Sequence, residues 1–194
     1  MSSDAAGFIG NIPQYYDQGL GPIIFAEYAA DIARRAAAGR PARVLETAAG
    51  TGIVTRKLRD ALPADTQLTA TDLNPPMLDI ARAKFRPGEQ VGFQPADAIA
   101  LPFADQSFDA MVCQFGLMFF PDRAKSFSEA HRVLAPGGRY LLNVWDSHRT
   151  IHLAALRMRC GALLPGRSAA VLQRAVLLPP DRSDQGAADR SRLR

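Results

Sequence analysis

Short apolar segments alternate with amphipathic segments through most of this 194-residue sequence. The apolar segments have the lengths and the bounding Gly, Pro and Asp residues of buried strands, and the segments between them repeat apolar residues at helical spacing. Strands are predicted at residues 43–46, 67–71, 91–93, 108–114 and 139–145. Helices are predicted at residues 22–38, 53–62, 77–84 and 121–134. Because such alternation forms βαβ units, we predict an α/β protein with a parallel sheet.

A glycine-containing loop, ETAAGTG at residues 46–52, follows the first predicted strand. Glycines there let the backbone approach a ligand closely, and the start of the next helix offers free N–H groups. The dinucleotide pattern G-x-G-x-x-G is incomplete, because Thr55 stands in the place of its third glycine. No Gly-Lys-Ser/Thr follows the loop, so the pattern of a P-loop is also missing. The loop therefore favours a ligand without a pyrophosphate, such as a nucleoside.

Two acidic residues follow the second and third predicted strands. Asp72 ends the second strand, twenty positions after Gly52, where an acid can accept hydrogen bonds from ribose hydroxyls. Asp97 follows the third strand and could accept a hydrogen bond from an adenine amino group. Either acid alone could belong to an ordinary turn, and Asn74, before two prolines, is predicted to cap the next helix. Their joint placement after consecutive strands predicts a nucleoside site at the carboxyl edge of the sheet.

These motifs resemble those of the class I S-adenosylmethionine-dependent methyltransferases, and most of all the branch that includes the ubiquinone/menaquinone C-methyltransferases. The matching stretches are VLETAAGTG at 44–52, TATDLNPPML at 69–78, PADAIALPFADQSFDAMVCQFGLMFF at 95–120 and EAHRVLAPGGRYLLNVW at 129–145. The resemblance implies a Rossmann-like, doubly wound sheet of the class I methyltransferase type. It also implies a methyltransferase that uses S-adenosyl-L-methionine and transfers the methyl group to a small-molecule acceptor by in-line displacement.

The resemblance further implies which residues contact the cofactor. They would hold its methionine end, its ribose and its adenine in turn, and they are Glu46, Ala48, Gly50, Gly52, Asp72, Leu73, Asp97, Ala98 and Gln114. Ala48 stands where the family pattern has a glycine, and Gln114 would face both cofactor and substrate. The catalytic residue is unknown, and Tyr16 and His148 are the candidates for a general base, which is needed only if the acceptor must lose a proton. No metal is expected, because the three His and two Cys lack ligand spacing.

The end of the chain differs in composition from the rest. Residues 151–194 contain eight Arg, three Asp and no aromatic residue, a net charge of +5, whereas residues 1–150 carry −1. The sixth and seventh strands of the family's sheet are not evident there. We interpret residues 149–194 as an atypical Arg-rich tail, out of frame or disordered, with the native frame lost near residues 149–157. The predicted organisation is then an N-terminal lid and helix at 1–40, a cofactor-binding core at 41–148, and this tail.

Three functions stay open from the sequence. The first is the active methyltransferase, the second is a truncated methyltransferase that binds the cofactor without turnover, and the third is an NAD(P)-binding Rossmann oxidoreductase. We expect a small-molecule partner and no nucleic acid, because the basic charge is confined to the tail. Without a secretory signal or an apolar run near 20 residues, we expect a cytoplasmic protein with no membrane span. The sequence gives no indication of oligomeric state.

Overall fold

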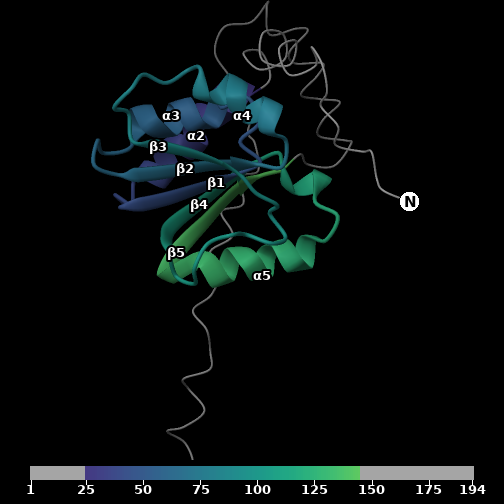
Figure 1. Ribbon diagram of the computed structural model, residues 1–194. Helices are drawn as coiled ribbons and strands as arrows, with labels where there is room; N and C mark the ends of the chain where they lie inside the picture. The colour runs from purple at the N-terminus through teal and green to yellow at the C-terminus, as the bar shows by residue number, and fades with distance from the viewer. Residues whose placement is uncertain (1–24, 145–194) are drawn as a thin grey trace, which may run out of the picture.

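The computed structural model describes residues 25–144, which form one parallel sheet between two layers of helices (Figure 1). The strands are β1 (Arg43–Thr47), β2 (Gln67–Asp72), β3 (Val91–Pro95), β4 (Phe108–Gln114) and β5 (Leu134–Asn143). The helices are α2 (Ala26–Ala37), α3 (Ile53–Ala61), α4 (Pro75–Arg82), α5 (Arg123–Val133) and the short 3₁₀ helix η2 (Leu117–Phe119). The predicted Rossmann-like α/β class is confirmed. Tyr16, His148, the predicted lid and the Arg-rich tail lie outside the described residues.

The helices divide between the two faces of the sheet. Figure 1 shows α2, α3 and α4 on one face and α5 on the other. One core cluster joins the apolar sides of α2 and α3 to Val44, Ala110 and Val112, and a second joins α5 to Leu45 and Met111. Neighbouring residues of a strand thus point into opposite cores, which explains why β4 is apolar along almost its whole length.

The strand order creates a crevice at the carboxyl edge of the sheet. The order is β3-β2-β1-β4-β5, so β1 pairs with β2 on one side and with β4 on the other. The chain moves outward from β1 in one direction, returns to its other side and then moves outward in the opposite direction. The segments that follow β1 and β4 therefore lead to helices on opposite faces of the sheet, and open α/β sheets bind ligands at such a point.

The structure differs from the sequence expectation at the start of β5. Leu134 already pairs with Phe108, five residues before the predicted strand start. The register then shifts between Phe108 and Ala110, and Arg139 pairs with Ala110. Gly137 has a φ of 79°, a left-handed conformation that suits glycine, so the Ala-Pro-Gly-Gly segment is an irregularity inside the strand rather than a turn before it.

Asn74 also differs from the expectation. It stands at the N-cap of α4, followed by prolines in the first turn, but its side chain makes no capping hydrogen bond. Its amide instead donates to Asp72 Oδ1 at 3.3 Å. The side chain therefore supports the carboxylate at the end of β2. Among residues 25–144 there is no helix whose length and hydrophobicity would let it cross a bilayer.

Candidate functional site

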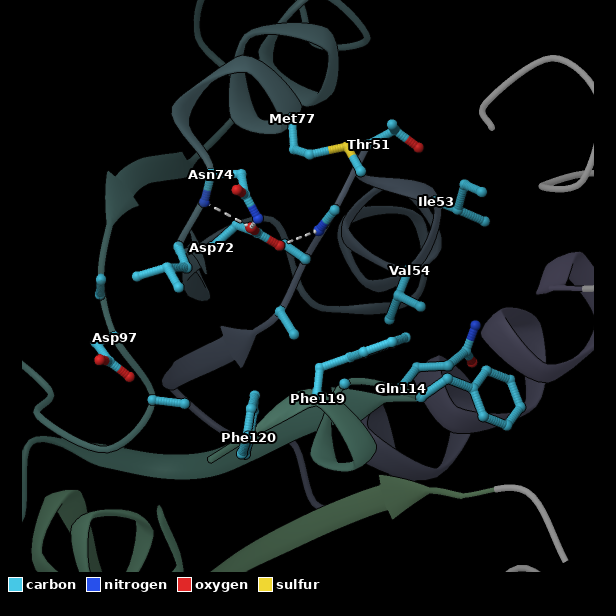
Figure 2. A pocket seen from close by; sticks show the side chains of 18 of the residues that line it. Thr51, Ile53, Val54, Asp72, Asn74, Met77, Asp97, Gln114, Phe119 and Phe120 are labelled. Carbon is cyan, nitrogen blue, oxygen red and sulfur yellow. Dashed lines mark hydrogen bonds between the residues drawn. The ribbon is translucent and has the colours of Figure 1, made fainter. Parts of the chain in front are cut away.

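Asp72 lies at the centre of the crevice, at the carboxyl end of β2. Its Oδ2 accepts a hydrogen bond from the Gly50 N–H at 2.8 Å, and its Oδ1 accepts one from the Asn74 N–H at 2.9 Å (Figure 2). The carboxylate thus joins the loop after β1 to the start of α4. Each carboxylate oxygen has about two acceptor sites; Oδ1 also accepts from the Asn74 side-chain amide, so Oδ2 is the oxygen with a site left for a ligand donor.

A pocket extends from Asp72 along the carboxyl edge of the sheet. Seven of the nine predicted cofactor residues line it, namely Ala48, Gly50, Asp72, Leu73, Asp97, Ala98 and Gln114. Figure 2 shows Asp72 and Asp97 on one side of the pocket and Gln114 on the other. Leu73 and Phe119 line the same pocket and are each 59% exposed. Large apolar side chains so exposed beside a cavity are typical of a surface that a ligand covers.

The two glycines of the loop after β1 have different surroundings. Gly50 has a φ of 55°, and a Cβ placed on it would meet nothing within 4 Å, so the backbone here is open to a ligand. Gly52 has a φ of 79°, but a Cβ on it would lie 2.7 Å from the Cβ of Ala81 in α4. Gly52 therefore permits the start of α3 to lie close to α4. The sequence predicted a ligand contact for Gly52 and did not reveal this packing role.

The loops after β1 and β4 touch each other at Ala48 and Gly116. A Cβ added to Gly116 would lie 2.3 Å from the Cβ of Ala48. Ala48 and Phe115 both have left-handed φ values, 53° and 55°, and both line the pocket. Non-glycine residues in this conformation cost about 1–3 kcal/mol each and cluster at functional sites.

Glu46 is buried beneath the loop that follows β1 and does not line the pocket. Its side chain is 2% exposed, and its Oε2 has no hydrogen-bond partner of normal geometry among the described residues. Burial raises the pKa of the carboxyl to about 8, the neighbouring Thr55 hydroxyl opposes this rise, and the nearby Asp72 carboxylate adds to it. The buried hydroxyls of Thr51 and Thr55 also lack partners. Of these three residues, Thr51 is the one that lines the pocket.

The raised pKa of Glu46 predicts a pH-dependent stability. In the unfolded chain the carboxyl ionises near 4.5, whereas the fold keeps it protonated until about 8. The protonated Glu46 carboxyl therefore makes its full contribution to the free energy of unfolding below pH 4.5. This contribution declines as pH rises to 8, by up to about 1.4 kcal/mol per pH unit. Denaturant unfolding at pH 5.5 and 7.5 should show Glu46→Gln gaining about 2 kcal/mol relative to wild type over this range. A difference that stayed constant with pH would mean that Glu46 is ionised in the folded protein.

Gln114 is held at both ends of its amide. Its Oε1 accepts from Asn143 Nδ2 at 3.1 Å, and its Nε2 donates to the Phe25 carbonyl at 3.3 Å. Asn143 ends β5 beside Gln114 in the sheet, a pairing that no sequence motif marked. Phe25 also lines the pocket, and its ring centroid lies 5.5 Å from that of Phe115. These contacts fix the Gln114 amide at the pocket wall.

Neither a nucleophilic thiol nor a metal centre is found at the crevice within residues 25–144. Cys113 is a free, buried cysteine of β4, and burial raises the pKa of its thiol, so it is a neutral core residue. No group of three or more His, Cys, Asp and Glu side chains in this part of the chain is arranged to hold a metal ion.

A family comparison agrees with this geometry. The family model described as Methyltransferase domain matches residues 45–142, half of the chain. The chain belongs to this family. The resemblance to the ubiquinone/menaquinone branch of the class I S-adenosylmethionine-dependent methyltransferases, predicted from the sequence, is confirmed by this match and by relatives with that name. Membership in this family disfavours the NAD(P)-binding oxidoreductase that the glycine loop had left open.

Alignments with individual relatives cover part of this chain and part of each relative. The chain is 45% identical over 103 residues to a demethylmenaquinone methyltransferase of Thermus thermophilus, an alignment that covers 53% of this chain and 46% of that protein. It is 35% identical over 151 residues to a demethylmenaquinone methyltransferase of Deinococcus radiodurans, covering 71% and 62%. The structure of the YcgJ protein from Bacillus subtilis aligns with a TM-score of 0.56 at 28% identity, covering 68% and 59%. The chain thus spans about half the length of the curated relatives it matches.

Proposed function

We propose that the protein binds S-adenosyl-L-methionine in the pocket at the carboxyl edge of the sheet and transfers its methyl group to a small-molecule acceptor. The observation that carries this proposal is the Asp72 carboxylate at the end of β2, which faces a pocket and is anchored to the Gly50 N–H. An acid at this place in a doubly wound sheet is suited to bind ribose hydroxyls.

The residues around Asp72 fit the remaining parts of this cofactor. Leu73 offers an exposed apolar surface on which one face of the adenine would pack, and Asp97 and Ala98, which also line the pocket, would contact the adenine edge. Gly50 leaves open space for the methionine end, and the buried, unpartnered oxygen of Glu46 lies below the same loop. The third glycine of the dinucleotide pattern serves the packing of helix against strand, and here the fully buried Thr55 takes that place.

The chain's own contribution to catalysis would be placement of the reactants. When bound, S-adenosyl-L-methionine would supply a methyl group made electrophilic by its sulfonium; an O, N, C or S nucleophile would bond to the methyl carbon in line with the breaking S–CH3 bond, and S-adenosylhomocysteine would leave. The apolar walls of the pocket, including Phe25, Phe119 and Phe120, exclude water from the space beside Gln114. Orientation of this kind can supply about 7–11 kcal/mol of barrier lowering without a general base.

The aromatic side chains also bear on the acceptor. Phe25, Phe115, Phe119 and Phe120 line the pocket and form an apolar rim suited to a flat, hydrophobic molecule. Two relatives are named demethylmenaquinone methyltransferases, so demethylmenaquinone is the first acceptor to assay. Product detection in this assay separates an active enzyme from a protein that binds the cofactor without turnover.

Titration calorimetry with S-adenosylhomocysteine tests the binding proposal directly. We expect one site per chain, a Kd of about 1–100 μM as is usual for small-ligand enzymes, and no heat with NAD⁺. Circular dichroism of the same sample establishes that the protein is folded. Folded protein that gives no heat with S-adenosylhomocysteine at 500 μM or so, well above that Kd range, would refute the proposal.

A further inference from the structure

The loop between β3 and β4 carries Asp97 and Ala98 but has no helix or strand of its own. It extends over residues 96–107 and contains one isolated bridge, between Asp97 and Ala100. Asp97 Oδ1 accepts from the Ile99 N–H at 3.0 Å, which shapes the turn but does not attach it to the rest of the fold. The position of the loop must therefore be set by contacts with other elements.

Arg132 of α5 supplies several of these contacts. Its guanidinium donates to the Leu101 carbonyl at 2.9 Å, the Phe103 carbonyl at 2.7 Å and Asp105 Oδ1 at 2.8 Å. Its own carbonyl accepts from the Gln106 N–H at 2.8 Å. A planar guanidinium presents five donors in a fixed arrangement, so it can hold several backbone oxygens at once.

Glu129, one turn earlier in α5, completes the arrangement. Its Oε2 accepts from the Leu101 N–H at 2.7 Å, and both carboxylate oxygens accept from the Arg132 guanidinium at 2.8 Å. The hydrogen bonds from Arg132 hold the pKa of Glu129 below its ordinary value. The pair therefore binds the N–H and the carbonyl of Leu101 together, three residues after the pocket-lining Ala98.

We infer that Glu129 and Arg132 are positioning residues for the adenine side of the cofactor site. Neither side chain lines the pocket; they act by fixing residues 96–107 so that Asp97 and Ala98 face it. This inference rests on the proposed function. It means that α5, which contacts the loop but not the pocket, contributes to cofactor affinity. Loss of the pair removes these contacts from residues 101–106, while the Ala96 N–H still donates to the Asp72 carbonyl, so the loosened part of the loop must be ordered again on binding, at a cost in affinity.

Calorimetry with S-adenosylhomocysteine on three variants tests the inference. We expect Arg132→Met to raise Kd by about tenfold or more, and Arg132→Lys to raise it less, because an ammonium keeps the positive charge but not the planar set of five donors. The matched control is Arg56→Met. Arg56 forms ion pairs with Asp60 and Glu89 at 2.7 Å each but touches neither the loop nor the pocket wall. The Kd of the Arg56→Met variant for S-adenosylhomocysteine should stay within about twofold of wild type.

A double-mutant cycle with Asp97→Asn separates positioning from general destabilisation. If Arg132 acts through Asp97, then Arg132→Met should cost less than about threefold in the Asp97→Asn background. Equal losses in both backgrounds, or an unchanged Kd in Arg132→Met, would overturn the inference while leaving the proposed function intact. Glu129→Gln, which retains an acceptor for Leu101, replaces Arg132→Met in the cycle if the latter unfolds. Absence of binding by the wild type would instead refute the proposed function.

Discussion

Asp72→Asn is expected to weaken S-adenosylhomocysteine binding by about 100-fold, or about 2.7 kcal/mol. The change removes the charge that would accept the ribose hydroxyls, and it weakens the 2.8 Å hydrogen bond from the Gly50 N–H that holds the loop after β1. An asparagine has one acceptor oxygen in place of two, so it cannot serve Gly50, Asn74 and a ribose together. Titration calorimetry on the purified variant gives the ratio of Kd values.

Asp109→Asn is the matched control for this result. The Asp109 carboxylate also joins two segments through backbone N–H groups, those of Ala42 and Arg43, at 3.0 and 2.8 Å. It does so at the amino end of β4, at the opposite edge of the sheet from the pocket. We expect its thermal stability to fall while Kd stays within about twofold of wild type. Equal affinities in the Asp72 and Asp109 variants would contradict the assignment of Asp72 to the ribose.

Gly52→Ala is expected to destabilise the fold by about 2–5 kcal/mol. A left-handed conformation costs an alanine about 1–2 kcal/mol, and forcing a methyl group into a filled space costs about 1–3 kcal/mol more. The space is filled by Ala81, whose Cβ would lie 2.7 Å and whose Cα 3.0 Å from the new methyl group. Denaturant unfolding followed by circular dichroism measures the loss.

Two other glycines separate the backbone cost from the steric cost. Gly137 has the same φ, 79°, and nothing within 4 Å of an added Cβ, so Gly137→Ala should lose only about 1–2 kcal/mol. Gly50→Ala should lose a similar amount of stability and, because Gly50 lines the pocket, should also lose affinity. If Gly52→Ala were no more destabilising than Gly137→Ala, the contact between the α3 start and α4 would not limit this position.

The sequence carried most of the information needed for the fold and for one wall of the pocket. The alternating pattern placed all five strands that the structure describes, and the acids at the ends of β2 and β3 indicated where a nucleoside could lie. Those residues are readable because each belongs to a local motif. The division of the chain at residues 40 and 148, and the contacts of individual residues with a cofactor, stay predictions.

The remaining features depend on contacts between segments far apart in the chain. Glu46 is buried beneath the loop after β1 because the surrounding elements pack over it. Gly52 faces Ala81 only because α3 and α4 pack together. The pairing of Gln114 with Asn143, and that of Arg132 with residues 101–106, likewise join elements that no local pattern connects. Periodicity predicts which face of a helix is buried, but not which distant backbone groups its polar side chains reach.

The contact between Ala48 and Gly116 couples the choice of residue at two distant positions. The gap between them accommodates a single methyl group, which here belongs to Ala48. Where a family member has glycine at the position of Ala48, the same volume becomes free for an alanine at the position of Gly116. The two loops at the centre of the sheet therefore share the space of one methyl group: the Ala48 methyl can be lost alone, whereas a methyl group at Gly116 requires that loss.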